Sequence, residues 1–140
     1  AHVLCKLPRD AEGYMGRLRC VQEISAVTAA CMMVKTSVFK AVGGFDEELK
    51  VAFNDIDLCM KVRTYGVKIV FTPYAELYHY ESKSRGMEDT PEKQLRFSRE
   101  VNCFRRKWER ELLKGDPYYN PNLTLNNTDC SLRKQEKNGD

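Results

Sequence analysis

The sequence lacks several features that would place the protein in a special class. No run approaches the ~18 apolar residues of a membrane-spanning helix, and the N-terminal stretch has no long apolar segment of the kind found in signal peptides. The six cysteines include no CxxC pair, and only two histidines could complete a zinc site. Scattered cysteines without a secretion signal favour reduced thiols in a cytoplasmic protein. A net charge of +3 is too small to indicate a polyanionic partner.

The composition is that of a globular domain with irregular ends. Hydrophobic residues make up 42% of the 140 residues and charged residues 31%, which is ordinary for a folded protein and enough for a packed core. Residues 1–20 are punctuated by glycine and proline and show no periodicity. Residues 126–140 are polar and are predicted to be a disordered tail. The folded unit is therefore expected over 21–125.

Apolar runs and chain breakers predict the first elements of this unit. The run "ISAVTAACMMV" (24–34) is almost wholly apolar and predicts a buried strand. Thr36 can cap a short helix, which Gly43 and Gly44 would end. Residues 45–53 are expected to form a loop.

The middle of the chain predicts a helix followed by strands. Asn54 is a candidate N-cap of a second helix, and Gly66 would close it. The segments "VKIVFTP" (67–73) and "AELYHY" (75–80) are expected to be strands. The Ser-, Gly- and charge-rich segment 81–89 is expected to be a mobile loop.

A long helix is predicted at the end of the folded unit. Thr90 would cap it, Pro91 suits its first turn, and Gly115 would end it. The order of strands and helices indicates an α/β layer structure. The apolar stripe of the long helix is Phe97, Val101, Phe104, Trp108 and Leu112.

Two acids, Asp55 and Asp57, lie at the start of the helix expected from Asn54, and they admit two interpretations. Carboxylates in the first turn interact favourably with the positive end of a helix, typically by about 0.3–1 kcal/mol. An Asp-x-Asp pair can instead hold a metal ion on a nucleotide diphosphate. That arrangement normally follows an apolar strand directly, whereas "KVAFN" precedes this pair. The residues alone favour the structural interpretation and leave both open.

Further polar residues are ambiguous when taken singly. His79 follows the apolar run "AELY", where a lone histidine is more often a hydrogen-bonded core residue than a ligand. Ser82, Lys83, Ser84 and Arg85 form a basic loop that could bind phosphate oxygens.

The basic segment 96–110 could be interpreted as a nucleic-acid-binding helix. Glu100 and Glu109 interrupt its positive charge, and its aromatic residues belong to the apolar stripe, so a solvated face is favoured. We expect no nucleic-acid partner; such a domain would bind DNA or RNA with a strong salt dependence.

The most specific pattern is an ordered series: "GGFDE", "FNDIDLC", a glycine, a strand, "HYESKSRG" and "DPYYNPNLTL". Over about 13–125 this series resembles the C-terminal half of bacterial family 2 glycosyltransferases of the rhamnosyltransferase-like type. The resemblance implies a partial GT-A fold, a Rossmann-like α/β nucleotide-diphospho-sugar transferase fold, of which this chain is the acceptor-side half with a long C-terminal helix. The N-terminal half of that fold, with its nucleotide-binding strands and Asp-x-Asp motif, is not found before residue 20.

The resemblance also implies roles for single residues. The Glu-Asp pair of the family corresponds to Asn54-Asp55, so Asp55 would be the general base and Asp57 would support the helix. His79 matches a position that helps to hold a metal ion or the diphosphate. The basic loop at Ser82, Lys83, Ser84 and Arg85 would bind the diphosphate, and the acceptor would contact Thr28, Phe45, Asp46 and Asn54.

The implied function is that of a fragment of an inverting glycosyltransferase. It would transfer a sugar from a nucleotide-diphosphate donor to a saccharide acceptor in polysaccharide or cell-envelope glycan synthesis, in the cytoplasm or at the inner face of the membrane. The complete enzyme is expected to use Mg²⁺ or Mn²⁺, which this chain alone would not bind tightly. The isolated chain is expected to be inactive, and the missing N-terminal half of the domain is an expected partner. A homodimer or swapped assembly of this chain is also expected, because exposed sheet edges invite pairing. The alternative is a non-catalytic glycosyltransferase-like module that binds a partner.

Overall fold

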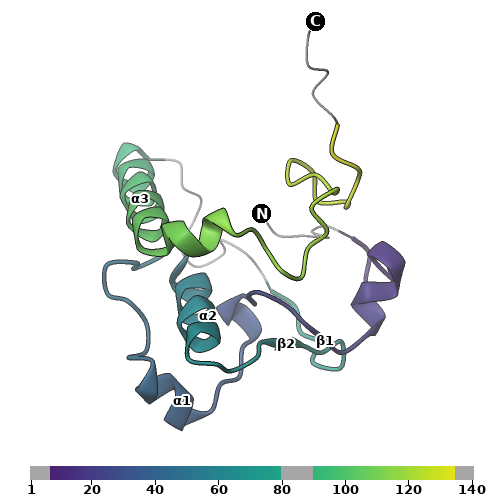
Figure 1. The fold of residues 1–140 in the computed structure, drawn as a ribbon, viewed down its shortest axis with the longest axis horizontal. Coiled ribbons are helices and arrows are strands. Elements are labelled where there is room, and N and C mark those ends of the chain that lie inside the picture. Colours follow the sequence, from purple (N-terminus) through teal and green to yellow (C-terminus); the bar gives the residue numbers. More distant parts are fainter. Residues whose placement is uncertain (1–6, 80–89, 135–140) are drawn as a thin grey trace, which may run out of the picture.

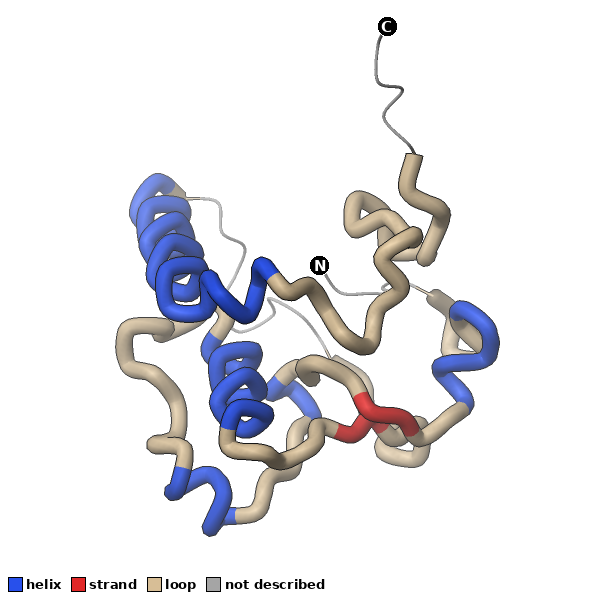
Figure 2. The backbone as a smooth tube through the Cα atoms, viewed as in Figure 1, coloured by secondary structure: helices blue, strands red, loops and turns tan. Residues whose placement is uncertain are grey.

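The computed structural model describes residues 7–79 and 90–134 (Figure 1). Much of this part of the chain is loop, and the strands are short (Figure 2). In chain order the elements are η1 (Tyr14–Arg19), β1 (Gln22–Glu23), η2 (Ala29–Cys31), α1 (Thr36–Ala41), α2 (Asn54–Thr64), β2 (Val70–Phe71) and α3 (Pro91–Leu113).

The sheet consists of β1 and β2, which pair in antiparallel orientation with Gln22 opposite Phe71. The strand predicted over 24–34 is wrong, since the run turns through η2 and Met33 is 99% exposed. A buried strand needs neighbours for both rows of backbone groups. The described residues supply little pairing beyond the hydrogen bond from Ile24 N–H to the carbonyl of Ile69 at 3.0 Å.

The two strands predicted in the middle of the chain have different outcomes. The first, over 67–73, is present only as the two residues of β2. The second, over 75–80, is wrong for 75–79, which are exposed and form no strand, and residue 80 lies outside the described residues. In place of a sheet partner, Glu76 accepts hydrogen bonds from the Arg9 guanidinium.

Helix α1 ends at a pair of glycines, as the sequence predicts. Lys35, and not Thr36, is its N-cap residue. Gly43 and Gly44 follow with φ of 77° and 63°, a left-handed conformation that glycine adopts without a Cβ penalty. A Cβ atom on Gly44 would lie 3.0 Å from the ring of Phe39, so this residue must also be small.

Helix α2 begins at Asn54, immediately after an unusual backbone conformation. Phe53 is the N-cap residue and has φ 64°, which is rare for a bulky residue. Its carbonyl oxygen accepts the hydrogen bond of Asp57 N–H at 2.7 Å. Gly66, with φ 89°, follows the C-cap residue and ends the helix where the sequence predicts.

Helix α3 begins where Thr90 and Pro91 predict. The Thr90 hydroxyl oxygen accepts a hydrogen bond from Lys93 N–H at 3.4 Å, and Pro91 occupies the first turn. The helix leaves helical geometry at Trp108 (φ −112°, ψ 17°), and its last part turns away from the first (Figure 1). Within the described residues, no helix has the length and apolar character needed to cross a membrane.

The core lies where α2, α3 and the loop 45–53 meet. Of the apolar stripe predicted on α3, Phe104 is buried, whereas Phe97 and Leu112 are 43% and 46% exposed. The stripe is therefore only partly covered. The buried apolar residues of this core are Leu49, Leu58, Cys59, Val62 and Phe104.

A second, smaller cluster lies in the C-terminal segment. Leu123 and Leu132 form an isolated antiparallel bridge, and Thr124 N–H donates to the carbonyl of Ser131 at 2.8 Å. Leu123, Thr124 and Cys130 are buried. In place of the disorder predicted from residue 126, the structure therefore has a closed turn through residue 133. Backbone pairing and side chain–backbone hydrogen bonds compensate for the polar composition that suggested disorder.

The glycine pair after α1 yields a matched test. Replacing Gly43 with Ala places a Cβ in open space, so only the left-handed backbone is penalised, by about 1–2 kcal/mol. Replacing Gly44 with Ala adds overpacking against Phe39, so we expect a further loss of about 1 kcal/mol in the free energy of unfolding. Urea unfolding of both variants measures the difference. Equal losses would show that the Phe39 ring moves aside at no cost.

Candidate functional site

A cleft of about 1490 Å³ lies beside α2, bounded by β1, β2 and the segment that follows α3. Its lining combines apolar side chains with many polar and charged ones. The residues of α2 that line it are Asp55, Ile56, Met60, Arg63 and Thr64. Clefts that combine apolar surface with convergent polar groups are common places for ligand binding.

Asp55 presents its carboxylate to this cleft from the first turn of α2. The residue is half-buried, and its position is set by local hydrogen bonds. Oδ1 accepts from the N–H of Ile56 at 2.8 Å, and Oδ2 accepts from the N–H of Ala29 at 3.1 Å. An ionised carboxylate can accept about four hydrogen bonds, so two acceptor positions remain for a ligand.

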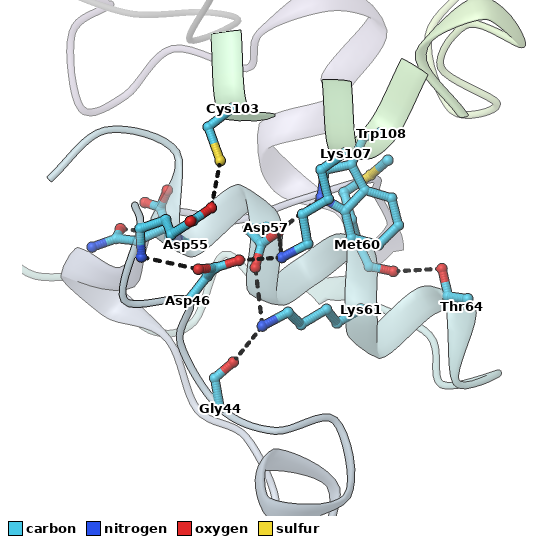
Figure 3. A network of polar contacts seen from close by, with 12 residues as sticks. Gly44, Asp46, Asp55, Asp57, Met60, Lys61, Thr64, Cys103, Lys107 and Trp108 are labelled. Carbon is cyan, nitrogen blue, oxygen red and sulfur yellow. Dashed lines mark hydrogen bonds and ion pairs between the residues drawn. The ribbon is translucent and has the colours of Figure 1, made fainter. Parts of the chain in front are cut away.

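Asp57 has the opposite environment, although it lies only two residues further on. Its side chain is 0% exposed, and it is surrounded by donors from α2 and α3 (Figure 3). Trp108 Nε1 donates to Oδ1 at 2.8 Å, and Lys107 Nζ lies 2.8 Å from the same oxygen. Lys61 Nζ forms an ion pair with Oδ2 at 3.1 Å and donates to the carbonyl of Gly44 at 3.0 Å. Asp57 thus has a structural environment, and its fully buried charge is paired with donors from both α2 and α3, beyond the helix-end interaction considered from the sequence.

The network continues from Asp57 to Asp46 through Lys107. Burial lowers the pKa of Lys107, but hydrogen bonds to Asp46 and Asp57 outweigh burial, so its pKa lies above the ordinary value. The same bond from Lys107, together with the N–H of Glu48, lowers the pKa of Asp46. The charged forms of Lys107 and Asp46 are thus the stable ones near neutral pH.

Helix α3 also holds the two residues that precede α2. Glu100, 3% exposed, accepts the hydrogen bond of Ala52 N–H with Oε2 at 2.7 Å. The ring of Phe53 stacks on Phe104 with centroids 5.1 Å apart and lies 6.0 Å from Phe97. A strained backbone such as that of Phe53 costs roughly 1–3 kcal/mol and persists only where its surroundings fix it.

The residues predicted to contact an acceptor separate into two groups. Thr28 lines the cleft with Asp55, and its hydroxyl oxygen accepts from Ala30 N–H at 3.3 Å. Phe45, Asp46 and Asn54 do not line it. Phe45 packs edge-on against Phe39 with ring centroids 5.6 Å apart, Asp46 binds Lys107, and Asn54 accepts from Asp55 N–H at 2.7 Å.

The residues predicted to bind metal and diphosphate are placed only in part. His79 is exposed and does not line the cleft. Over 7–79 and 90–134, no three His, Cys, Asp or Glu side chains gather in a way that could hold a metal ion, so these residues alone do not fit a divalent metal site. Ser82, Lys83, Ser84 and Arg85 lie outside the described residues.

Four residues beside the site were not predicted to contribute to it: Phe53, Glu100, Lys107 and Trp108. The sequence pattern places Trp108 on an apolar stripe and Glu100 on a solvated face. The one usable signal is that Trp108 is the single tryptophan of the chain, because a buried indole N–H needs an acceptor. That signal does not identify Asp57 as the acceptor.

Comparison with known proteins relates the chain to proteins named for glycan synthesis. It is 39% identical over 115 residues to the O-antigen biosynthesis protein RfbC of Myxococcus xanthus. The aligned region covers 82% of this chain and 9% of that protein. It is 34% identical over 62 residues to an N-acetylglucosaminyl-diphospho-decaprenol L-rhamnosyltransferase of Mycobacterium tuberculosis, which covers 44% of this chain and 20% of that protein.

A higher identity is found with a protein whose name states no activity. The chain is 56% identical over 126 residues to the uncharacterized protein y4gI of Sinorhizobium fredii, which covers 89% of this chain and 14% of that protein. The chain thus spans a fifth or less of the length of these curated relatives. No protein-family model matches it, and no solved structure matches it significantly.

The burial of Asp57 predicts a large effect of removing its charge. Breaking a buried ion pair typically costs about 3–5 kcal/mol, and the lower end applies here because Lys107 and Lys61 each keep a second partner. We expect Asp57→Asn to lose about 3 kcal/mol of unfolding free energy in urea. Asp55→Asn, the control at the half-buried acid, should lose less than about 1 kcal/mol, because Asn serves equally well at a helix start. Similar losses for the two variants would contradict the difference in burial.

The lowered pKa of Asp46 predicts an acid-dependent contribution to stability. Its pKa is lower in the folded than in the unfolded chain, so the contribution is present above the ordinary value of 3.8 and is lost as the pH falls through the folded pKa. The stability difference between wild type and Asp46→Asn should therefore be constant near neutral pH and shrink below about pH 4. Urea unfolding across this range measures it, with Glu47→Gln, an exposed carboxylate, as control. A difference that does not change with pH would contradict the ion pair.

Proposed function

We propose that this chain is the acceptor-side part of an inverting glycosyltransferase, with Asp55 as the general base. The observation that carries the proposal is the contrast between the two acids at the start of α2. Asp57 is buried and neutralised by Lys107 and Lys61, whereas Asp55 lines a cleft and keeps acceptor positions for a ligand. Of these two acids, Asp55 is therefore the one that we propose meets an acceptor.

The chemistry of an inverting transfer requires such a group. The acceptor hydroxyl attacks the anomeric carbon in line with the leaving nucleoside diphosphate, and it loses its proton as the new bond forms. A carboxylate within hydrogen-bond reach, about 2.6–3.2 Å, can take that proton. In this proposal the hydrogen bonds from Ala29 and Ile56 orient the Asp55 carboxylate, and Thr28 on the same cleft contacts the acceptor.

The donor side of the reaction is proposed to lie largely outside the described residues. The leaving diphosphate gains negative charge, which His79, the basic loop at 82–85 and a divalent ion such as Mg²⁺ or Mn²⁺ would stabilise. The remaining ligands of that ion would come from elsewhere in a longer polypeptide. This division is supported by the relatives, of whose length the chain spans only 9–20%.

The exposed apolar surface supports an association with further polypeptide. Met33, Tyr74 and Tyr78 are 99%, 83% and 82% exposed, and apolar residues also line the open cleft beside α2, so the described residues offer apolar surface that further polypeptide could cover. We propose that the isolated chain lacks transfer activity and acts together with the donor-binding part. A non-catalytic module that binds a partner would share this surface. The catalytic part and the module differ in whether sugar transfer depends on Asp55.

The test compares the isolated chain with the full natural polypeptide that carries it, using a panel of nucleoside-diphosphate sugars and saccharide acceptors. We expect no turnover by the isolated chain and measurable transfer by the longer protein. Asp55→Asn in the longer protein should lower the transfer rate by about 10²–10⁴-fold, the usual contribution of general base catalysis, while donor affinity stays unchanged.

The controls separate the parts of this proposal. Thermal melting should show that Asp55→Asn folds like the wild type. An unchanged transfer rate in Asp55→Asn would exclude Asp55 as the base, and turnover by the isolated chain would exclude the division into two parts. A full-length protein inactive with every donor would favour the partner-binding module.

A further inference from the structure

The start of α2 is fixed to α3 at three points that bracket Asp55 in the sequence. Before Asp55, Ala52 N–H donates to Glu100 and the Phe53 ring stacks on α3; after it, Asp57 accepts from the Trp108 indole. The hydrogen bonds to the Asp55 carboxylate itself come from Ala29 and Ile56, and α3 supplies none of those seen in the described part of the chain. These contacts of α3 are therefore made with residues on either side of Asp55 and not with its carboxylate.

Stability alone is a poor explanation for these contacts. Buried ion pairs can often be replaced by apolar residues of similar volume without loss of stability. The junction between α3 and the start of α2 nevertheless buries the carboxylates of both Glu100 and Asp57. Phe53 has a backbone conformation that bulky residues rarely adopt. Helix α3 also departs from helical geometry at Trp108, the residue whose indole reaches Asp57 (Figure 3). The buried carboxylates, the left-handed Phe53 and the distorted turn at Trp108 are each unfavourable locally. Each of them also fixes one particular geometry of the contact between α3 and the start of α2.

We propose that Glu100 and Trp108 are positioning residues for the Asp55 carboxylate. By holding Ala52 and Asp57 they fix the course of the backbone over 52–57, and with it the direction in which Asp55 points into the cleft. Neither residue lines the cleft. The consequence for catalysis rests on the proposed function of Asp55 as base, whereas the positioning does not.

The orientation of Asp55 can be measured in the 140-residue chain without any assay of activity. The amide protons of Ala29 and Ile56 donate to Asp55, so their NMR shifts should follow the ionisation of this carboxylate in a pH titration. Asp55→Asn identifies the part of each shift that belongs to Asp55. The Ala29 signal is the informative one, because Ala29 is 26 residues away and loses its hydrogen bond if Asp55 turns.

Four variants test the proposal, all measured below the melting temperature of each. Trp108→Phe removes the indole N–H and keeps aromatic bulk, and Glu100→Leu removes the acceptor of Ala52 N–H; both should abolish the pH-dependent shift of the Ala29 amide proton. Glu100→Gln keeps an acceptor oxygen and should retain the shift. Leu113→Ala, at an 82% exposed position of the same helix, should also retain it. If Trp108→Phe does not fold, the pair at Glu100 decides the outcome.

The results that would overturn the proposal are specific. Retention of the Ala29 shift in both Trp108→Phe and Glu100→Leu would show that α3 contributes only to stability. Loss of the shift in Leu113→Ala or Glu100→Gln would show general loosening in place of positioning.

A second measurement links positioning to catalysis in the full natural polypeptide. A displacement of about 1 Å at a reacting group can cost about 10²-fold in rate, so Trp108→Phe should lower kcat by about 10–100-fold and leave the KM of the donor within about twofold. If Asp55→Asn leaves the rate unchanged but the Ala29 shift is lost in Trp108→Phe, the base assignment fails and the positioning holds. If Asp55→Asn is slow but the Ala29 shift survives in the α3 variants, the positioning fails and the base assignment holds.

Discussion

The burial of the Asp57 carboxylate is the interaction on which the rest of the described structure depends. A charge removed from water requires donors close by, and Asp57 obtains them from Lys61 on its own helix and from Lys107 and Trp108 on α3. Because these donors come from two elements distant in sequence, the carboxylate can be satisfied only when α2 and α3 are docked. The sheet, with two residues in each strand, is too small to hold these elements together.

The same junction places an accessible acid beside a buried one. Asp55 and Asp57 lie in one helical turn and share a residue type, yet one faces a cleft and the other the core. The difference follows from the helical rotation of about 200° between positions i and i+2, which turns successive acids to opposite sides of α2. One face of the turn is thus committed to packing, and the other faces the cleft.

The sequence predicted the helices better than the strands for a physical reason. Helix starts and ends depend on local signals, so Gly66, Thr90 and Gly115 lie where the sequence placed them. A strand depends on a partner that local sequence does not reveal, and the apolar run 24–34 turns through η2 instead of pairing. The candidate site shows the same division. Asp55 was predicted as a site residue because the local pair Asn54-Asp55 resembles a family motif, whereas the contact of Trp108 with Asp57 spans 51 residues and was missed.

The distance in sequence between Asp57 and its donors on α3 also determines when these donors become available during synthesis of the chain. A ribosome adding about 5–20 residues per second needs roughly 3–10 s to proceed from Asp57 to Trp108. Until α3 is synthesised, the carboxylate has only Lys61 and solvent among these partners, and Phe53 lacks the rings of Phe97 and Phe104. During synthesis there is therefore a stage in which the residues of α2 are complete but their contacts with α3 cannot yet form.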